Sequence, residues 1–521
     1  MRRERVADGV LAAALVPLSL FVALPFRAEA MARTSVSSLG WDAALHAAEG
    51  LDLFDDLRLL RPRDALGLLA SRHWWGPLWA LVSAPFQAAF GPSLSAASLP
   101  SLAAFALAPS AAFLLARRLV PGGLLASAAT FLLVAGLFLR SPMLLEASAW
   151  PMLESLGGFL ALLAWLFFSR RPERRTQRAA FLAGAALFLL KYHFGFFVLG
   201  TFLAVVLVEE TPDERRRLGT AARAFLIRGA GAGILALAAA LAALRVLLEA
   251  RGGDALASRA PSVSNVAWGA FVLFTVLLVI RRRVFAEAWR SASGTFRDFV
   301  LFGLVPPALW CLDPANVRGW YRQVFQPTEA PERNPLAKLA TFGSFLKGDY
   351  TLGAGPASLV LFGLLLALAL PGARTRRALA AFAVWPALLM SLDTFPLEPR
   401  FLACLVPALL AAATAGLSAL AATLPEKGRG PALVAAAVLL SLGLDPVRWR
   451  AECGRRASYA YAYGPAEVAA VNAAIAAAPV SGPVRLRLPA DPPVWPTARL
   501  ALRLARRELS PSDVDVSAEA P

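Results

Sequence analysis

The sequence predicts an all-α polytopic membrane protein with about thirteen transmembrane helices and a small α/β-like C-terminal tail. Apolar residues make up 58% of the 521 residues, against roughly 45–50% in soluble domains. Charged residues make up 17%, where about 25% is usual. The apolar residues gather in repeated runs with Lys and Arg between them. This pattern excludes an ordinary soluble enzyme.

The first apolar run, Val10–Phe26, follows a basic start at Arg2, Arg3 and Arg5. The segment Ala28–Ala30 resembles a signal-peptidase site, so a cleaved signal peptide is the alternative to a first transmembrane helix. We favour an uncleaved helix with a cytoplasmic N-terminus, because many further apolar runs follow.

The later runs approach the length of about 20 residues that crosses a bilayer. They are Leu94–Ala116, Pro121–Leu139, Pro151–Phe168, Ala179–Leu190, Phe194–Val208, Phe225–Leu248, Val266–Ile280, Phe299–Leu312, Pro356–Leu370, Leu379–Leu392, Phe401–Ala421 and Pro431–Leu444. The two runs around Lys191 are short, and one kinked helix is the alternative to two spans. Two spans keep the basic clusters on one side.

The formal charge of +17 is interpreted from the positions of the basic residues along the chain. In a soluble protein it would suggest nucleic acid as a partner. Here the basic residues follow every second span, so they predict cytoplasmic ends and no nucleic-acid binding. They are Arg117–Arg118, Arg170–Arg178, Arg215–Arg217, Arg281–Arg283, Arg374–Arg377, and Lys427 with Arg429. We expect a multi-pass protein of a bacterial-type cytoplasmic membrane, in contact with membrane lipids.

This topology divides the chain into a membrane domain, residues 1–446, and an extracytoplasmic tail, residues 447–521. The long loops face outward: about 27–93, 140–150, 249–265, 313–355 and 393–400. Within the first, residues 73–90 are apolar and aromatic with two prolines, which indicates an interfacial or re-entrant helix. The tail contains an aromatic patch at 459–463, helices at 466–478 and 497–508, and a strand at 484–488. Because soluble loops tend to carry function, we expect the chemistry on the outer face.

Polar residues recur at helical spacing in the first outer loop. Asp42, His46 and Glu49 stand at i, i+4 and i+7 and share one helix face. A polar face turned to water is the alternative to a site. The following Asp52, Asp55 and Asp56 are expected to be solvated, near Arg58 and Arg61.

A second group of candidates lies at the outer ends of later spans. Glu154 stands about one turn inside an apolar run, where a carboxylate needs a cavity or a partner such as Arg140. Lys191, His193 and Arg400 offer positive charge on the same side, which a phosphate-bearing substrate would need. Snorkelling anchors are the alternative for the Lys and Arg.

The histidines are His46, His73 and His193, and all fall on the predicted outer face. No metal-ligand spacing is present, so we expect no cofactor, with a divalent cation left open. Cys311, Cys404 and Cys453 form no motif, and we expect neither a disulfide nor a cysteine-built metal site.

Several short motifs occur in a characteristic order over residues 10–421. They are Trp41-Asp42, a His-opened aromatic segment with Pro (His73 to Leu78), Phe90-Gly91-Pro92-Ser93, Leu99-Pro100-Ser101, Leu115-Ala116-Arg117-Arg118-Leu119, Pro151 to Glu154 leading to Phe159-Leu160-Ala161-Leu162, Gly184 to His193, and Arg400-Phe401 leading to Val406-Pro407-Ala408. In this order the chain resembles the GT-C superfamily of polyprenyl-phosphate-sugar-dependent glycosyltransferases, especially its protein-mannosyltransferase-like and aminoarabinose-transferase-like branch.

The resemblance implies transfer of a sugar from a polyprenyl-phosphate donor to an envelope lipid, glycan or protein on the outer face, with inversion. It implies Asp42 as the base or acceptor-positioning group, and Glu154 as an orienting group or second base. His46, His73, Lys191, His193 and Arg400 are the substrate-binding candidates. The chain departs from the family's pattern in having Ala43 after Asp42, a spread-out His73 motif and Ser98 before Leu99. The competing functions are a transporter or flippase and a non-catalytic envelope scaffold.

Overall fold

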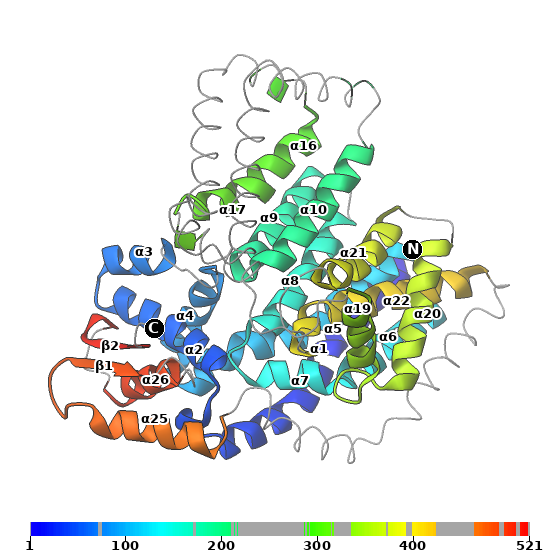
Figure 1. Cartoon of the computed structure of the whole chain (residues 1–521). Helices are drawn as coiled ribbons and strands as arrows, with labels where there is room; N and C mark the ends of the chain where they lie inside the picture. Colours follow the sequence, from blue (N-terminus) through cyan, green and yellow to red (C-terminus); the bar gives the residue numbers. More distant parts are fainter. Residues whose placement is uncertain are drawn as a thin grey trace.

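The computed structural model is a helical bundle with a smaller α/β module at one end (Figure 1). The structure describes residues 2–70, 76–169, 173–209, 213, 216, 286, 289–290, 292–313, 315–316, 335–370, 374–391, 399–423, 463–488, 494–506 and 511–518. The predicted spans Phe225–Leu248, Val266–Ile280 and Pro431–Leu444 lie outside the described residues.

Nine of the predicted spans correspond to helices. These are α1 (Arg2–Arg33), α5 (Leu94–Leu119), α6 (Leu124–Leu139), α8 (Leu153–Phe168), α9 (Arg174–Leu190), α10 (Tyr192–Glu209), α20 (Ala354–Ala369), α21 (Arg374–Ser391) and α22 (Val406–Thr423). Helix α5 packs against α1, α8 and α22 and lies at the centre of the bundle. Aromatic side chains fill the space between α8, α9 and α10, where the ring centroids of Phe168 and Phe202 are 4.1 Å apart.

Helix length limits how many spans the structure confirms. Among the described residues, three helices are long and apolar enough to cross a membrane, Glu4–Ala32 within α1, α5 and α22. A bent pair, α6 with α7 (Pro142–Ala149), makes a fourth if it counts as one span. The count of thirteen therefore stays a prediction.

Most of the predicted outer loop at residues 140–150 is helix α7 (Pro142–Ala149). Ser141 caps this helix through its side-chain oxygen, and Pro142 stands at its first position, where proline fits best. All eight residues of α7 are buried, and its axis turns 67° from α6. The segment thus fills the bundle instead of covering it.

The predicted span Phe299–Leu312 is composite. It continues from α16 (Gly294–Asp298) through a π-helical segment, η2 (Phe299–Leu304), into α17 (Val305–Trp310). Pro306 and Pro307 lack the N–H groups that an α-helix would use here, which accounts for the change of winding. Helix α19 (Pro335–Lys347) lies in the predicted outer loop 313–355.

The first outer loop folds into helices. A 3-10 turn, η1 (Val36–Ser38), precedes α2 (Trp41–Arg58), which is followed by α3 (Pro62–Ala70) and α4 (Leu78–Phe90). Helix α4 confirms the helix expected within residues 73–90, and it packs against α2 and α5. Helix α1 extends to Arg33 and so enters the predicted loop.

The tail forms its own small core next to the first outer loop. It consists of α25 (Pro465–Ala477), β1 (Val484–Leu488), α26 (Trp495–Ala505), a turn η4 (Pro511–Asp513) and β2 (Val514–Ala518). The strands are parallel, with Val484 opposite Val514, and α26 connects them. Both predicted helices and the first strand are confirmed, but α26 also packs on α2, which the sequence did not reveal.

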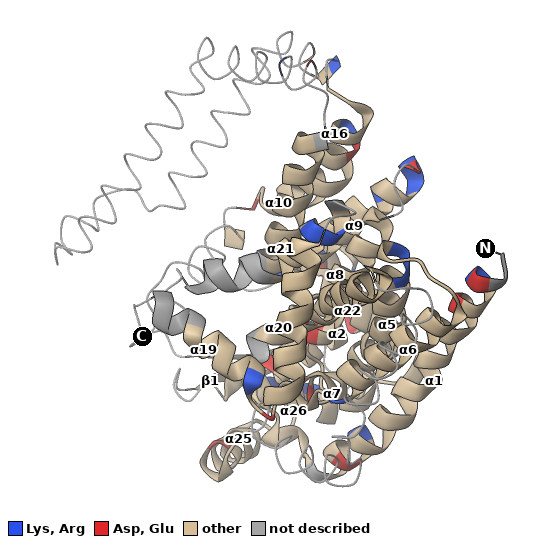
Figure 2. Cartoon of the chain, turned by 90° about the vertical axis from the view of Figure 1, so that its right-hand side faces the viewer, with Lys and Arg blue, Asp and Glu red and all other residues tan. Residues whose placement is uncertain are grey.

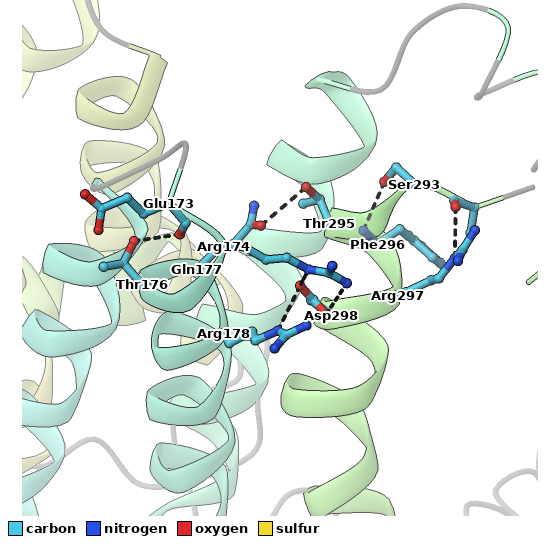
Figure 3. A network of polar contacts seen from close by, with 11 residues as sticks. Glu173, Arg174, Thr176, Gln177, Arg178, Ser293, Thr295, Phe296, Arg297 and Asp298 are labelled. Atoms are coloured by element: carbon cyan, nitrogen blue, oxygen red, sulfur yellow. Dashed lines mark hydrogen bonds and ion pairs between the residues drawn. The ribbon is translucent and has the colours of Figure 1, made fainter.

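Helix α16 lies at the end of the bundle away from the tail module in both views (Figures 1 and 2). There the buried Asp298 carboxylate accepts hydrogen bonds from Arg174 at 2.7 Å and forms an ion pair with Arg178 at 3.1 Å (Figure 3). Burial alone would raise the pKa of Asp298, but the two guanidinium groups outweigh it and hold the pKa below its usual value. Part of the basic cluster 170–178 therefore joins α9 to α16.

Candidate functional site

Asp42 lies in the first turn of α2, where a carboxylate interacts favourably with the helix dipole. The predicted shared face of Asp42, His46 and Glu49 does not point to bulk water. Asp42 is 9% exposed and His46 is 1% exposed. The solvated-face alternative is therefore wrong for these two residues, which face the protein interior.

His46 is held by contacts on both sides of its ring. Its Nδ1 lies 3.5 Å from the Glu49 carboxylate. On the other side, the indole of Trp79 lies 5.9 Å from the His46 ring, centroid to centroid, and its Nε1 donates a 2.9 Å hydrogen bond to the His46 carbonyl. Trp79 therefore fixes α4 to the part of α2 that carries Asp42 and His46.

Trp79 also connects α2 to the bundle. It is fully buried in a cluster with Ala104, Leu153, Leu156 and Leu190, which come from α5, α8 and the end of α9. Leu153 directly precedes Glu154, and Leu190 directly precedes Lys191. Trp79 thus links the helix of Asp42 to the two chain positions that carry the next pair of candidates.

Glu154 and Lys191 form a buried ion pair. The Nζ of Lys191 donates a 2.8 Å hydrogen bond to Oε1 of Glu154, and both side chains are at most 4% exposed. The sequence suggested an arginine such as Arg140 as the partner of the Glu154 carboxylate. In the structure Lys191 pairs with it. Lys191 does not snorkel to the surface, and its ammonium also lies 5.7 Å from the centroid of the Phe194 ring.

The motif Leu99-Pro100-Ser101 contacts the start of α8 through Ser101. The Ser101 hydroxyl donates to the Met152 carbonyl at 3.0 Å, and the Met152 N–H lies 3.3 Å from the same hydroxyl oxygen. Met152 is the N-cap of α8, two residues before Glu154. Ser101 therefore sets where the helix of Glu154 begins.

The remaining predicted site residues are placed by their backbone alone or lie outside the described residues. His193 belongs to the first turn of α10, two residues after Lys191. Arg400 lies in a 3-10 segment, η3 (Pro399–Cys404), which packs against α8. In that contact the Cys404 Sγ is 3.6 Å from the Glu154 carbonyl oxygen. His73 lies outside the described residues.

The aspartates after Glu49 are buried, and the prediction that they are solvated is wrong. Asp52, Asp55 and Asp56 are at most 3% exposed. Arg499 and Arg503 of α26 bind Asp52 at 2.8 and 3.2 Å, and Arg503 also binds Asp55. The partners stand about 450 positions away in the chain, so no local pattern could have indicated them.

Tyr463 is a residue near Asp42 that sequence reasoning did not select. Its backbone N–H donates to the Ser38 carbonyl at 2.8 Å. Burial raises the pKa of Tyr463 to about 12, and the negative charges of Asp42 and Glu467 add to the effect. The phenol is therefore neutral at physiological pH. The aromatic patch 459–463 was the only signal in the sequence.

Among the residues that the structure describes, no group of three or more His, Cys, Asp or Glu side chains is arranged to hold a metal ion.

Three solved structures resemble this chain, and the first of them shows the fold. The crystal structure of ArnT from Cupriavidus metallidurans bound to undecaprenyl phosphate matches 98% of this chain and 89% of its own, with a TM-score of 0.51 and 14% sequence identity. The apo state of the same protein matches 86% of this chain and 76% of its own, with a TM-score of 0.43 and 18% identity. The apo oligosaccharyltransferase of Archaeoglobus fulgidus matches 89% of this chain and 57% of its own, with a TM-score of 0.43 and 13% identity.

No family model and no curated protein sequence matches the chain. The likeness to ArnT over nearly the whole chain confirms the fold expected from the resemblance to GT-C membrane glycosyltransferases.

Proposed function

We propose that this protein is an integral membrane glycosyltransferase. It transfers a sugar from a polyprenyl-phosphate donor to an envelope lipid, glycan or protein, on the outer face of the cytoplasmic membrane and with inversion. The observation that carries the proposal is the position of Trp79. It joins the helix of Asp42 to the chain positions next to Glu154 and Lys191, so a carboxylate and a cation belong to one packed assembly.

The donor class is supported by the fold. ArnT from Cupriavidus metallidurans, which shares that fold, was crystallised with undecaprenyl phosphate. A polyprenyl chain gains roughly 0.8 kcal/mol for each CH₂ group that it buries, so apolar surfaces between helices suffice to hold such a donor. Donor affinity then depends little on which sugar is attached.

In the proposed reaction an acceptor hydroxyl or amine attacks the anomeric carbon. The bond between that carbon and the phosphate oxygen breaks, and its electron pair leaves with the polyprenyl phosphate. Asp42 takes the proton of the acceptor, a contribution typically worth about 10²–10⁴-fold in rate. The leaving phosphate needs positive charge rather than a proton, which Lys191, His193 and Arg400 provide.

The ion pair defines a role for Glu154. The Glu154 carboxylate accepts a 2.8 Å hydrogen bond from the Lys191 ammonium, so it fixes the position of that cation. Glu154 therefore orients Lys191. The alternative role of a second base would place the same carboxylate in contact with the acceptor, and it is less favoured because Oε1 already accepts a hydrogen bond from Lys191.

The test is Asp42→Asn, which keeps the size of the side chain and removes the base. The expected result is loss of the transferred sugar, measured by mass spectrometry of envelope glycolipids and polysaccharides from a deletion strain that expresses each variant. The matched control is Asp515→Asn, an exposed carboxylate that pairs with Arg487 in the tail and should leave transfer intact. Wild-type product from a folded Asp42→Asn protein would contradict the catalytic role. Movement of a labelled lipid without any sugar transfer would favour a transporter.

A further inference from the structure

The tail module contacts the first outer loop at both ends of α2. At the start of α2, the Thr497 hydroxyl donates to the Leu39 carbonyl at 2.8 Å, and the Tyr463 N–H donates to the Ser38 carbonyl at 2.8 Å. At the far end, Arg499 and Arg503 bind Asp52 and Asp55. Asp42 and Asp55 are 13 positions apart, so the contacts span about 20 Å of helix.

Burial makes the contacts at the far end specific. Arg503 is completely buried and Arg499 is 28% exposed, while both aspartates are at most 3% exposed. Two guanidinium groups of α26 face two carboxylates of α2, and Arg58 also lies 3.5 Å from Asp55. A buried cation needs such partners, because its desolvation is otherwise costly. Arg503 can therefore be satisfied only when α26 lies against α2 in this position.

The contacts with Asp52 and Asp55 lie on a different side of α2 from Asp42. At 3.6 residues per turn, Asp52 and Asp55 stand about 80° and about 140° around the helix from Asp42. The tail thus holds the helix from another side. Tyr463, whose N–H binds the Ser38 carbonyl, is close enough for the charge of Asp42 to add to the rise in its pKa that burial causes.

We propose that the tail module is a clamp that positions Asp42 for the transfer reaction. Thr497 acts at the start of α2, and Arg503 acts through Asp52 and Asp55. Both are positioning residues, since they touch the helix and not the reacting atoms. The role in transfer rests on the proposed function, whereas the ordering of α2 by the clamp does not. A catalytic carboxylate displaced by about 1 Å loses on the order of a hundredfold in rate, so this ordering has a measurable effect.

The experiment compares Arg503→Gln with Arg487→Gln in full-length protein in lipid nanodiscs. Arg487 belongs to the same module but forms an exposed pair with Asp515, so it is a matched control. Hydrogen–deuterium exchange reports the order of residues 41–47. Binding of undecaprenyl phosphate and sugar transfer in cells are measured on the same variants. For Arg503→Gln we expect faster exchange at 41–47, unchanged lipid binding, and transfer reduced about tenfold to a hundredfold. Arg487→Gln should change none of the three.

Two further variants separate positioning from stability. The double variant Arg503→Gln with Asp55→Asn removes the carboxylate that the first change leaves behind, so the amount of folded protein should recover while exchange at 41–47 stays fast and transfer stays low. Should Arg503→Gln fail to fold, Thr497→Val removes one hydrogen bond to the loop at nearly constant shape and should show the same pattern with a smaller effect.

The proposal is overturned if faster exchange is confined to residues 50–58, or if transfer recovers together with the folded protein in the double variant. A wild-type protein without any transfer activity would instead remove the proposed function. The exchange measurement would then still show whether the clamp orders α2.

Discussion

The two ends of the molecule use arginine–carboxylate pairs in opposite ways. At the α16 end, the carboxylate of Asp298 is buried while its partners Arg174 and Arg178 are 61% and 39% exposed. At the tail end, Arg503 is buried together with Asp52 and Asp55. An exposed guanidinium keeps its hydration and can be replaced by water, whereas a buried one depends on its partners. Removing an arginine should therefore cost more folding stability at the tail end than at the α16 end.

This difference extends to Glu154 and Lys191, which lie on the side of the tail and are as buried as Arg503. Positive charge near the proposed site is thus held by carboxylates inside the protein. Positive charge at the α16 end is more exposed, since the side chains of Arg174 and Arg178 are 61% and 39% exposed. Three substitutions test this comparison, in order of decreasing effect.

Lys191→Met should have the largest effect of the three. It leaves Glu154 buried without the Lys191 cation, which typically costs about 3–5 kcal/mol, and it removes the proposed donor to the phosphate. The free energy of unfolding is measured in mixed micelles, and sugar transfer is measured in cells. The control is the double variant Lys191→Met with Glu154→Gln, which removes both charges and should recover much of the stability but no transfer. Full transfer by the double variant would show that Lys191 does not serve the donor phosphate.

The raised pKa of Asp56 predicts that the folding stability at the tail end depends on pH. Burial, followed by the charges of Asp52 and Asp64, raises the pKa of Asp56 from 3.8 to about 6. The folded protein therefore holds this proton more tightly than the unfolded chain does. Ionising Asp56 costs stability above about pH 6, and this cost disappears as the pH falls towards 3.8.

Asp56→Asn is neutral at every pH, so it should raise Tm above the wild-type value near neutral pH. The difference should shrink between about pH 6 and pH 4 and vanish below. Thermal unfolding across this pH range is the measurement. A constant difference at all pH values would mean that packing, and not charge, accounts for the change.

Arg174→Gln should have the smallest effect. Arg174 is 61% exposed, and Asp298 keeps its ion pair with Arg178, so the loss should be at most about 1 kcal/mol. Sugar transfer should be unchanged. A loss comparable to that of Lys191→Met would show that exposure does not explain the difference between the two ends.

Local sequence patterns predicted most of the described helices. Apolar runs placed α5, α8 and α20 within a few residues of their bounds, because each needs only its own neighbours to be apparent. Alternation of apolar and charged residues placed β1 at Val484–Leu488 without error. Helix α7 was missed because eight residues between two turns carry too little periodicity to predict a helix.

The candidate site was predicted less completely. The sequence indicated Asp42, Glu154 and Lys191 as candidates. It did not indicate that Glu154 and Lys191, 37 positions apart, bind each other. It described Asp52 and Asp55 as solvated because they are clustered in the sequence near Arg58 and Arg61. Their actual partners are in α26, and packing between distant segments is not encoded in any local spacing.

The contact between Ser101 and Met152 has a consequence for sequence variation. Ser101 binds main-chain atoms, which every residue at position 152 would supply. During evolution, position 152 should therefore accept any apolar residue of similar volume. Position 101 should accept only a residue with a hydroxyl group. Drift at one position and constraint at the other would mark this contact in related sequences.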